Sequence, residues 1–165
     1  MQSQNTNLYR KIPAWLVPSE CDALESMSHD VQWEQGRQGT GYLKHGLIHE
    51  PAAQLWIQRA LHVLGDPEEF DAWLLYYPTG SEIPAHTDPA REGMCHVRLN
   101  AIVTGCIGGD LYLGNKKLAL SQTDAYIFRP DITLHSVTPI QAGSRIVLSV
   151  GASVSTTEAQ ALGLA

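Results

Sequence analysis

One stretch organises this sequence, YPTGSEIPAHTD at residues 77–88, because it places a histidine and a carboxylate two positions apart just after a hydrophobic run. Side chains at positions i and i+2 of a strand leave from the same face, so we expect His86 and Asp88 to point into one space. Imidazole nitrogens and carboxylate oxygens are both common metal ligands. The stretch therefore predicts half of a metal site.

A second stretch, DITLHSV at residues 131–137, supplies the missing half through His135. Two imidazoles and one carboxylate on one side of an ion leave coordination positions open, an arrangement associated with non-haem Fe(II) oxygenases. We therefore predict that His86, Asp88 and His135 are the metal ligands and the catalytic residues. The remaining histidines lack such a setting and are expected to have no role in the chemistry: His29, His45, His49, His62 and His96.

The order and spacing of several motifs resemble those of the Fe(II)/2-oxoglutarate-dependent dioxygenases, and more closely their prolyl-hydroxylase-like branch. These motifs are Tyr77, Gly80, His86-Thr87-Asp88, Gly108-Gly109-Asp110-Leu111, Leu134-His135 and Gly143-Ser144-Arg145. The resemblance covers roughly residues 72–151. It implies an α+β, mainly β fold, a double-stranded β-helix or jelly roll with N-terminal helices packed against one sheet.

The length of 165 residues fits a single domain, 1–165. We place the metal and cosubstrate core at about 72–151 and the N-terminal helical support at 8–65. A helix capped by Ser19 is expected over 18–28, and a second helix over 51–64. Strands are expected at 8–12, 72–77, 95–103, 110–113, 125–128 and 145–150, with a hairpin between 111–113 and 118–120 across a turn at 114–117, and either a short helix or irregular chain at 152–165.

The resemblance assigns Arg145 to the distal carboxylate of 2-oxoglutarate, which a planar guanidinium can bind through two parallel hydrogen bonds. It also places a cosubstrate-holding phenol at Tyr77, whose neighbour Tyr76 must face the opposite way. Arg98 and Asn100 share one face of the 95–103 strand, which either lines the pocket or faces water. We take Asn100 as a cosubstrate contact and Arg98 as a substrate contact.

Residues 30–47 are polar and glycine-rich. The simplest interpretation is a solvated hairpin or loop. The functional alternative is a flap that gates the substrate and grips it with aromatic and basic side chains, Arg37 and Lys44 among them, with Trp33 and Tyr42 as substrate contacts.

The resemblance implies an enzyme that uses Fe(II), 2-oxoglutarate and O2, and it admits ascorbate as a reductant. Such an enzyme hydroxylates an unactivated C–H of an amino acid, a peptidyl residue or a related small molecule, and releases succinate and CO2. The carboxylate of Asp88 favours hydroxylation over halogenation. Two alternatives remain open, a non-catalytic jelly-roll protein that binds a metal or ligand and a cupin-type metalloenzyme without a cosubstrate.

Composition narrows the partners. The net charge of −6 argues against binding to a nucleic-acid backbone. No apolar run is long enough to span a bilayer and no signal peptide is visible, so we expect a cytoplasmic protein without membrane contact. Cys21, Cys95 and Cys106 are expected to be free thiols. A small molecule, amino acid or peptide is the expected partner, and the chain is expected to be a monomer or homodimer.

Overall fold

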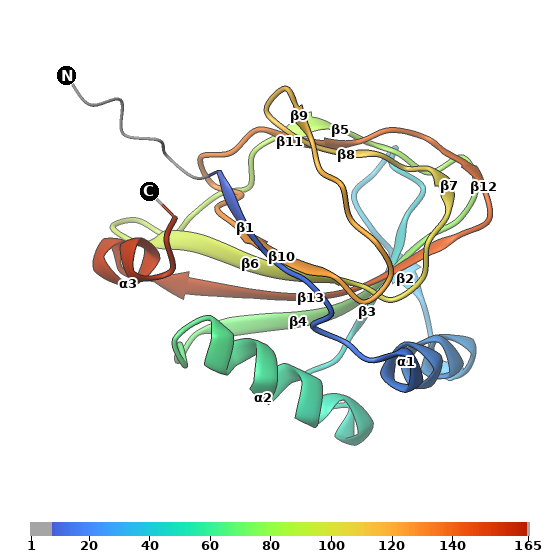
Figure 1. Ribbon diagram of the computed structural model, residues 1–165, viewed down its shortest axis with the longest axis horizontal. Coiled ribbons are helices and arrows are strands. Elements are labelled where there is room, and N and C mark those ends of the chain that lie inside the picture. The colour runs from blue at the N-terminus through green and yellow to red at the C-terminus, as the bar shows by residue number, and fades with distance from the viewer. Residues whose placement is uncertain (1–7, 165) are drawn as a thin grey trace.

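The computed structural model describes residues 8–164, which form a mainly β structure with few helices (Figure 1). The helices are α1 (Pro18–Asp30), the 3-10 helix η1 (Pro51–Ala53), α2 (Gln54–Val63) and α3 (Thr156–Ala161). The strands are β1 (Tyr9–Ile12), β2 (Glu34–Gln35), β3 (Leu43–Gly46), β4 (Phe70–Tyr77), β5 (Ile83–His86), β6 (Cys95–Ile102), β7 (Ile107–Gly108), β8 (Leu111–Leu113), β9 (Lys116–Lys117), β10 (Ala125–Phe128), β11 (His135–Val137), β12 (Ile140–Ala142) and β13 (Arg145–Val154).

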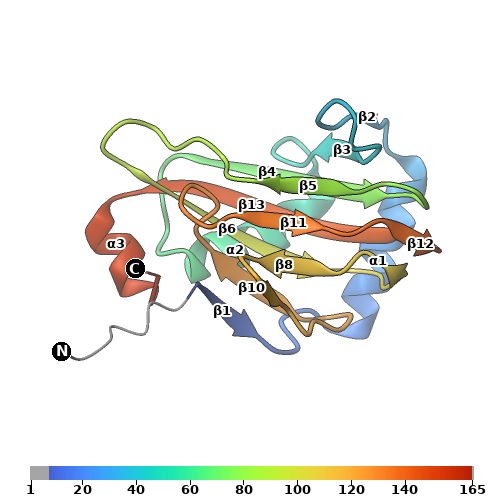
Figure 2. The same ribbon diagram turned by 90° about the horizontal axis from the view of Figure 1, so that it is seen from above.

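Two antiparallel sheets face each other. The major sheet has seven strands in the order β1-β10-β6-β13-β4-β3-β2, and the minor sheet has four in the order β5-β11-β8-β9. Strands β12 and β7 form a further pair. Figure 2 shows the minor sheet lying over the major sheet. Strands far apart in the sequence are therefore brought onto opposite walls of one interior space.

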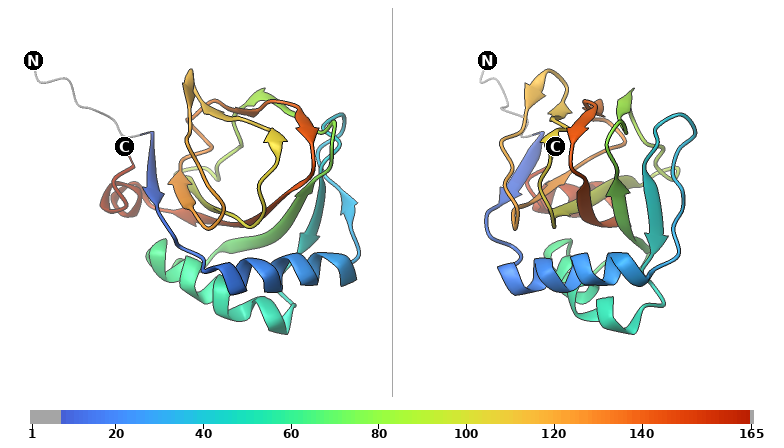
Figure 3. Two further views of the ribbon diagram at one scale, coloured as in Figure 1. Left: turned by 45° about the vertical axis from the view of Figure 1, so that its right-hand side comes forward. Right: turned by 90° about the vertical axis from the view of Figure 1, so that its right-hand side faces the viewer.

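The major sheet buries its other face against α1 and α2, as Figure 3 shows. Leu74, Leu99 and Leu148 come from its three central strands and are fully buried in one cluster with Leu24 of α1 and Ile57 of α2. Because side chains alternate along a strand, the intervening residues of these strands face the minor sheet. The expectation of N-terminal helices packed against one sheet is confirmed.

The start of α1 differs from the expectation. The helix begins at Pro18, whose fixed φ suits the first helical position, so Val17 is the N-cap residue and Ser19 already lies inside the first turn. The prediction of a Ser19 cap was wrong. Glu20 instead supplies a hydrogen-bond acceptor at the N-terminus of the helix, because its Oε2 accepts from the Val17 amide at 3.0 Å. The same carboxylate accepts from Arg59 of α2 at 3.0 and 3.1 Å, which ties the two helices together.

The hairpin after β8 is tighter than expected. Leu113 pairs with Lys116, so the turn consists of Gly114 and Asn115, and Gly114 has a φ of 60° that favours glycine. The return strand is therefore β9, and the prediction of a return strand over 118–120 was wrong.

The C-terminal segment forms α3, the helical one of the two outcomes we expected. Ser155 caps this helix by accepting from the Glu158 amide at 3.2 Å. No helix within residues 8–164 combines the length and apolar character needed to cross a membrane. The three cysteines are free, as predicted.

Candidate active site

A cavity of about 250 Å³ lies between the two sheets. The minor sheet contributes His86 at the end of β5 and His135 at the start of β11. The major sheet contributes Tyr77, Asn100 and Arg145 from β4, β6 and β13. Most of the polar residues singled out from the sequence thus line one cavity.

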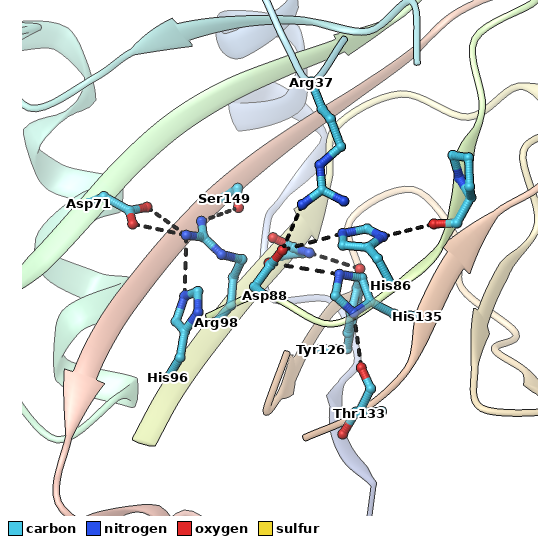
Figure 4. A network of polar contacts seen from close by, with 12 residues as sticks. Arg37, Asp71, His86, Asp88, His96, Arg98, Tyr126, Thr133, His135 and Ser149 are labelled. Atoms are coloured by element: carbon cyan, nitrogen blue, oxygen red, sulfur yellow. Dashed lines mark hydrogen bonds and ion pairs between the residues drawn. The ribbon is translucent and has the colours of Figure 1, made fainter. Parts of the chain in front are cut away.

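His86, Asp88 and His135 form a cluster in which one ligand atom from each residue lies within 4.8 Å of the others. The two histidines are direct cross-strand partners, with ring centroids 4.2 Å apart. Asp88 places Oδ1 3.3 Å from Nε2 of His86 and Oδ2 3.8 Å from Nε2 of His135 (Figure 4). This spacing suits ligands that surround one ion.

Asp88 was expected to lie on the same strand as His86, but the structure positions it differently. Strand β5 ends at His86, so Asp88 lies beyond it. The Asp88 amide donates to the carbonyl of Pro130 at 2.8 Å, which fixes the backbone at this point. The two side chains converge as expected, but a loop anchored to the neighbouring segment positions the carboxylate.

Backbone carbonyls fix the orientation of both imidazoles. Nδ1 of His86 lies 2.8 Å from the Pro84 carbonyl, and Nδ1 of His135 lies 3.0 Å from that of Thr133. A carbonyl oxygen only accepts, so each Nδ1 carries a proton, and the tautomer that this selects has its lone pair on Nε2, where a metal can bind. Burial lowers the pKa of His135, and the nearby His86 lowers it further, whereas the bond to the Thr133 carbonyl opposes the change. His135 is therefore neutral near pH 7, as a metal ligand must be.

Arg145 is the first residue of β13, and its side chain lines the same cavity. Its Nη1 donates to the Gly109 carbonyl at 2.6 Å. Its Nε is buried and has no hydrogen-bond partner among the described residues. Position 109 requires glycine, because its φ is 65° and a Cβ there would clash with Cδ1 of Ile140. A guanidinium whose Nε is buried and unpaired is suited to hold an anion.

Of the two adjacent tyrosines, Tyr77 lines the cavity and Tyr76 does not. Tyr76 packs on the helix side of the sheet against Trp33, with ring centroids 5.5 Å apart. Burial raises the pKa of Tyr77 far above its usual value, and the Arg145 charge offsets only part of this rise. Tyr77 therefore stays a neutral phenol.

Asn100 and Arg98 both line the cavity, but their hydrogen bonding differs. Asn100 donates to Oη of Tyr126 at 2.8 Å, while its Oδ1 is buried without a partner in the part of the chain that the structure describes. Arg98 is already paired, because its Nη2 donates to both oxygens of Asp71 at 2.9 Å and its Nη1 donates to Ser149 at 2.8 Å (Figure 4).

The region 30–47 forms a hairpin that extends the major sheet through β2 and β3. Tyr42 lines the cavity and stacks on Tyr77, with centroids 5.3 Å apart. Trp33, expected as a substrate contact, does not line the cavity. Its Nε1 donates to the Ser28 carbonyl at 3.2 Å, and its ring belongs to the helix-side core, so we no longer include it in the substrate site.

Trp73 is among the cavity residues that sequence reasoning missed, whereas Arg37 and Lys44 were expected to contact the substrate only if the 30–47 region was a flap. Counting back from Tyr77 in steps of two would have found Trp73, because both lie on the cavity face of β4. No local signal in the sequence indicates the exact place of Arg37 and Lys44, because that place depends on how the hairpin folds.

Neither the protein-family models nor the curated protein sequences contain a match to this chain. Solved structures do match. A prolyl-4-hydroxylase from Pseudomonas putida superposes with a TM-score of 0.73 at 16% identity, covering 88% of this chain and 92% of that one. A Trichoplax adhaerens prolyl hydroxylase in complex with a hypoxia inducible factor peptide fragment gives 0.71 at 16% identity, covering 95% and 88%. HygX from Streptomyces hygroscopicus, solved with nickel and 2-oxoglutarate, gives 0.72 at 10% identity, covering 92% and 84%.

The chain therefore has the fold of the Fe(II)/2-oxoglutarate oxygenases. Prolyl hydroxylases are among the structures it resembles, so the likeness drawn from the sequence motifs is confirmed at the level of the fold.

Proposed function

We propose that this protein is an Fe(II)- and 2-oxoglutarate-dependent oxygenase that hydroxylates an unactivated C–H of an amino acid, peptidyl residue or related small molecule. One observation carries the proposal: the cluster of His86, Asp88 and His135 shares a single cavity with Arg145. Its fold, two facing antiparallel sheets, supports the double-stranded β-helix expected for such an enzyme. The presence of 2-oxoglutarate in HygX and in a viral collagen prolyl hydroxylase of similar fold supports the choice of cosubstrate.

The donor set fits both groups. Two neutral imidazoles and a carboxylate suit Fe(II) and leave positions for other ligands. The unpaired Nε of Arg145 is a buried donor that lacks a partner within residues 8–164, and a carboxylate of the bound cosubstrate would accept from it. Arg145 would hold the distal carboxylate, with Tyr77 and Asn100 beside it.

When bound, iron and 2-oxoglutarate supply O2 activation, with release of succinate and CO2. The protein orients the metal ligands and excludes water from the site. The Pro84 and Thr133 carbonyls hold the two imidazoles in the ligating tautomer. Leu75, Ile102 and Val147 give the cavity an apolar floor that keeps water from the reacting carbon.

The test is to add Fe(II) and 2-oxoglutarate to the protein without oxygen and to record the visible spectrum. A weak charge-transfer band is expected, followed by succinate formation once O2 is admitted. Absence of both would leave the alternative of a non-catalytic metal- or ligand-binding protein. Oxygen consumption that needs the metal but not 2-oxoglutarate would favour the cupin-type alternative.

Several finer expectations belong to this proposal. We propose that one domain carries the whole activity, that hydroxylation rather than halogenation is the reaction, and that ascorbate sustains turnover by keeping the iron reduced. The three free thiols support a cytoplasmic location. We propose a monomer or a homodimer, and sedimentation velocity distinguishes the two.

A further inference from the structure

The cavity is positively charged although the protein is acidic. The whole chain has a net charge of −6. The cavity wall nevertheless contains four cationic side chains, Arg37, Lys44, Arg98 and Arg145, against one carboxylate, Asp88. Positive charge gathered in one concave site on an acidic protein indicates an anionic ligand.

Two of the four cations already have partners. Arg98 is neutralised by the bidentate ion pair with Asp71. Arg145 is assigned to the distal carboxylate of 2-oxoglutarate, so this step rests on the proposed function. Arg37 and Lys44 remain, and neither is needed by the metal or the cosubstrate.

Arg37 lies in the turn between β2 and β3, above Asp88 in Figure 4. Its Nη2 is 3.5 Å from Asp88 Oδ1, and its side chain is 48% exposed. A divalent cation bound to Asp88 would take up most of the charge of that carboxylate. The guanidinium has five N–H donors, and its contact with Asp88 is long and uses only one of them. Arg37 therefore faces the cavity with N–H donors free to bind a ligand.

Lys44 lies on β3, next to Leu75 of β4. Its Nζ sits 4.4 Å from the ring centroid of Trp73, and it forms no ion pair with any residue in 8–164. The aromatic face stabilises the ammonium but occupies none of its three N–H donors. Lys44 is thus a half-buried cation that lacks an anion.

We propose that Arg37 and Lys44 together bind a carboxylate of the substrate, and that Trp73 packs against its carbon skeleton. The substrate class is then a free amino acid or another small organic acid. An internal residue of a peptide is disfavoured, because its backbone carries no charge for the two cations to meet. The Lys44 and Arg37 pair would hold one end of the molecule and present its C–H bonds to the metal.

The test compares acids with their neutral amides. The protein is loaded anaerobically with Zn(II) and 2-oxoglutarate and titrated by calorimetry with the proteinogenic amino acids, simple hydroxy acids and short peptides, each against its carboxamide. We expect at least one acid to bind about tenfold or more tightly than its amide, the usual size of a charge-assisted contact. The same acid should stimulate succinate release in the Fe(II) enzyme.

Two variants and two matched controls locate the effect. Arg37→Gln and Lys44→Met should each weaken acid binding by about tenfold or more and leave binding of the amide nearly unchanged. Lys116→Met is the matched control for Lys44, because Lys116 also lies over an aromatic ring, that of Tyr9, but on the exposed strand β9 outside the cavity. Arg10→Gln, on the exposed face of β1, serves the same purpose for Arg37. Both controls should bind the acid as the parent does.

A panel in which no acid binds more tightly than its amide contradicts the proposal, as does an acid preference that survives both variants. If a peptide's free C-terminus is preferred over the free amino acid, carboxylate binding by Arg37 and Lys44 is supported, and the small-acid substrate is contradicted. If the Fe(II) and 2-oxoglutarate band forms while no acid is preferred, the substrate inference fails and the proposed function stands. If the band is also absent, both fail.

Discussion

Arg145 and Tyr77 are cross-strand partners in the antiparallel pair β13 and β4, and the guanidinium carbon of Arg145 lies 5.0 Å from the centre of the Tyr77 ring. The register of the major sheet thus sets the phenol against the guanidinium. The carbonyl of Gly109, in the short segment between β7 and β8, accepts from the same guanidinium at 2.6 Å. Both contacts fix Arg145 before any ligand arrives, which reduces the entropy lost on binding.

Arg145→Lys should therefore weaken binding of 2-oxoglutarate. A lysine keeps the charge but loses the planar fork, so we expect KM for 2-oxoglutarate to rise about tenfold or more, and further in Arg145→Met. Succinate release measured against 2-oxoglutarate concentration checks this. Affinity for Zn(II) should stay at the parent value in both variants, and a KM equal to that of the parent would exclude Arg145 from the cosubstrate site.

Asp88→Ala should remove the only carboxylate of the cluster. Loss of a ligand that also touches both imidazoles is expected to lower turnover by at least about a hundredfold. Asp110→Ala is the control. The Asp110 carboxylate forms an ion pair with Lys117, with Oδ2 2.7 Å from Nζ, and it does not belong to the cluster. Near-normal succinate release in Asp88→Ala would refute the metal-ligand assignment.

Metal removal should leave the fold intact. The cluster lies between the sheets, whereas the largest buried cluster lies between the major sheet and the helices. Chelation is therefore expected to leave the far-ultraviolet circular dichroism unchanged. Added Zn(II) should raise Tm, since a ligand that binds the native state alone stabilises it. The rise should vanish in Asp88→Ala, and unfolding on chelation would show that the metal has a structural role.

Asp124 should contribute stability that depends on pH. Burial alone would raise its pKa, but hydrogen bonds from Lys11 and from the Ser121 and Ala14 amides outweigh burial, so the pKa lies below the ordinary value. A lowered pKa in the folded state means that the stabilisation is complete above the unfolded pKa of about 3.9 and is lost as the pH falls through the lower folded value.

Asp124→Asn is accordingly expected to reduce the free energy of unfolding by about 1 to 3 kcal/mol at neutral pH. Urea denaturation at a series of pH values should show this difference shrinking below about pH 4. Glu92→Gln, on an exposed turn, provides the comparison for loss of a surface charge. A difference that stays constant down to pH 3 would contradict the proposed origin of the stability.

The site residues that sequence predicted best are those set by strand alternation and by short motifs. Tyr77 and Asn100 face the cavity because residues two apart share a face, and the two histidines meet because β5 and β11 pair in register. Trp33 was misplaced because it precedes β2, and nothing local shows that its ring turns toward Tyr76 on the helix side.

Contacts between segments that are distant in the sequence could not be predicted. The Arg37 to Asp88 and Arg98 to Asp71 pairs join residues that are distant in sequence, and their formation depends on how the hairpin and strands pack. The start of α1 was missed for a different reason. Pro18 at the first position and the reach of Glu20 back to Val17 outweighed the capping preference of Ser19.

The major sheet has one face against the helices and the other toward the cavity. Successive residues along each strand therefore either pack in the core or line the cavity. Replacing Trp73 or Val147 changes the interior lining, whereas Leu74 and Leu148 beside them carry the packing that keeps the chain native. New catalytic specificities can therefore be explored by varying alternate positions of these strands in a combinatorial library. A compact scaffold with this separation is a practical starting point for laboratory evolution of a biocatalyst.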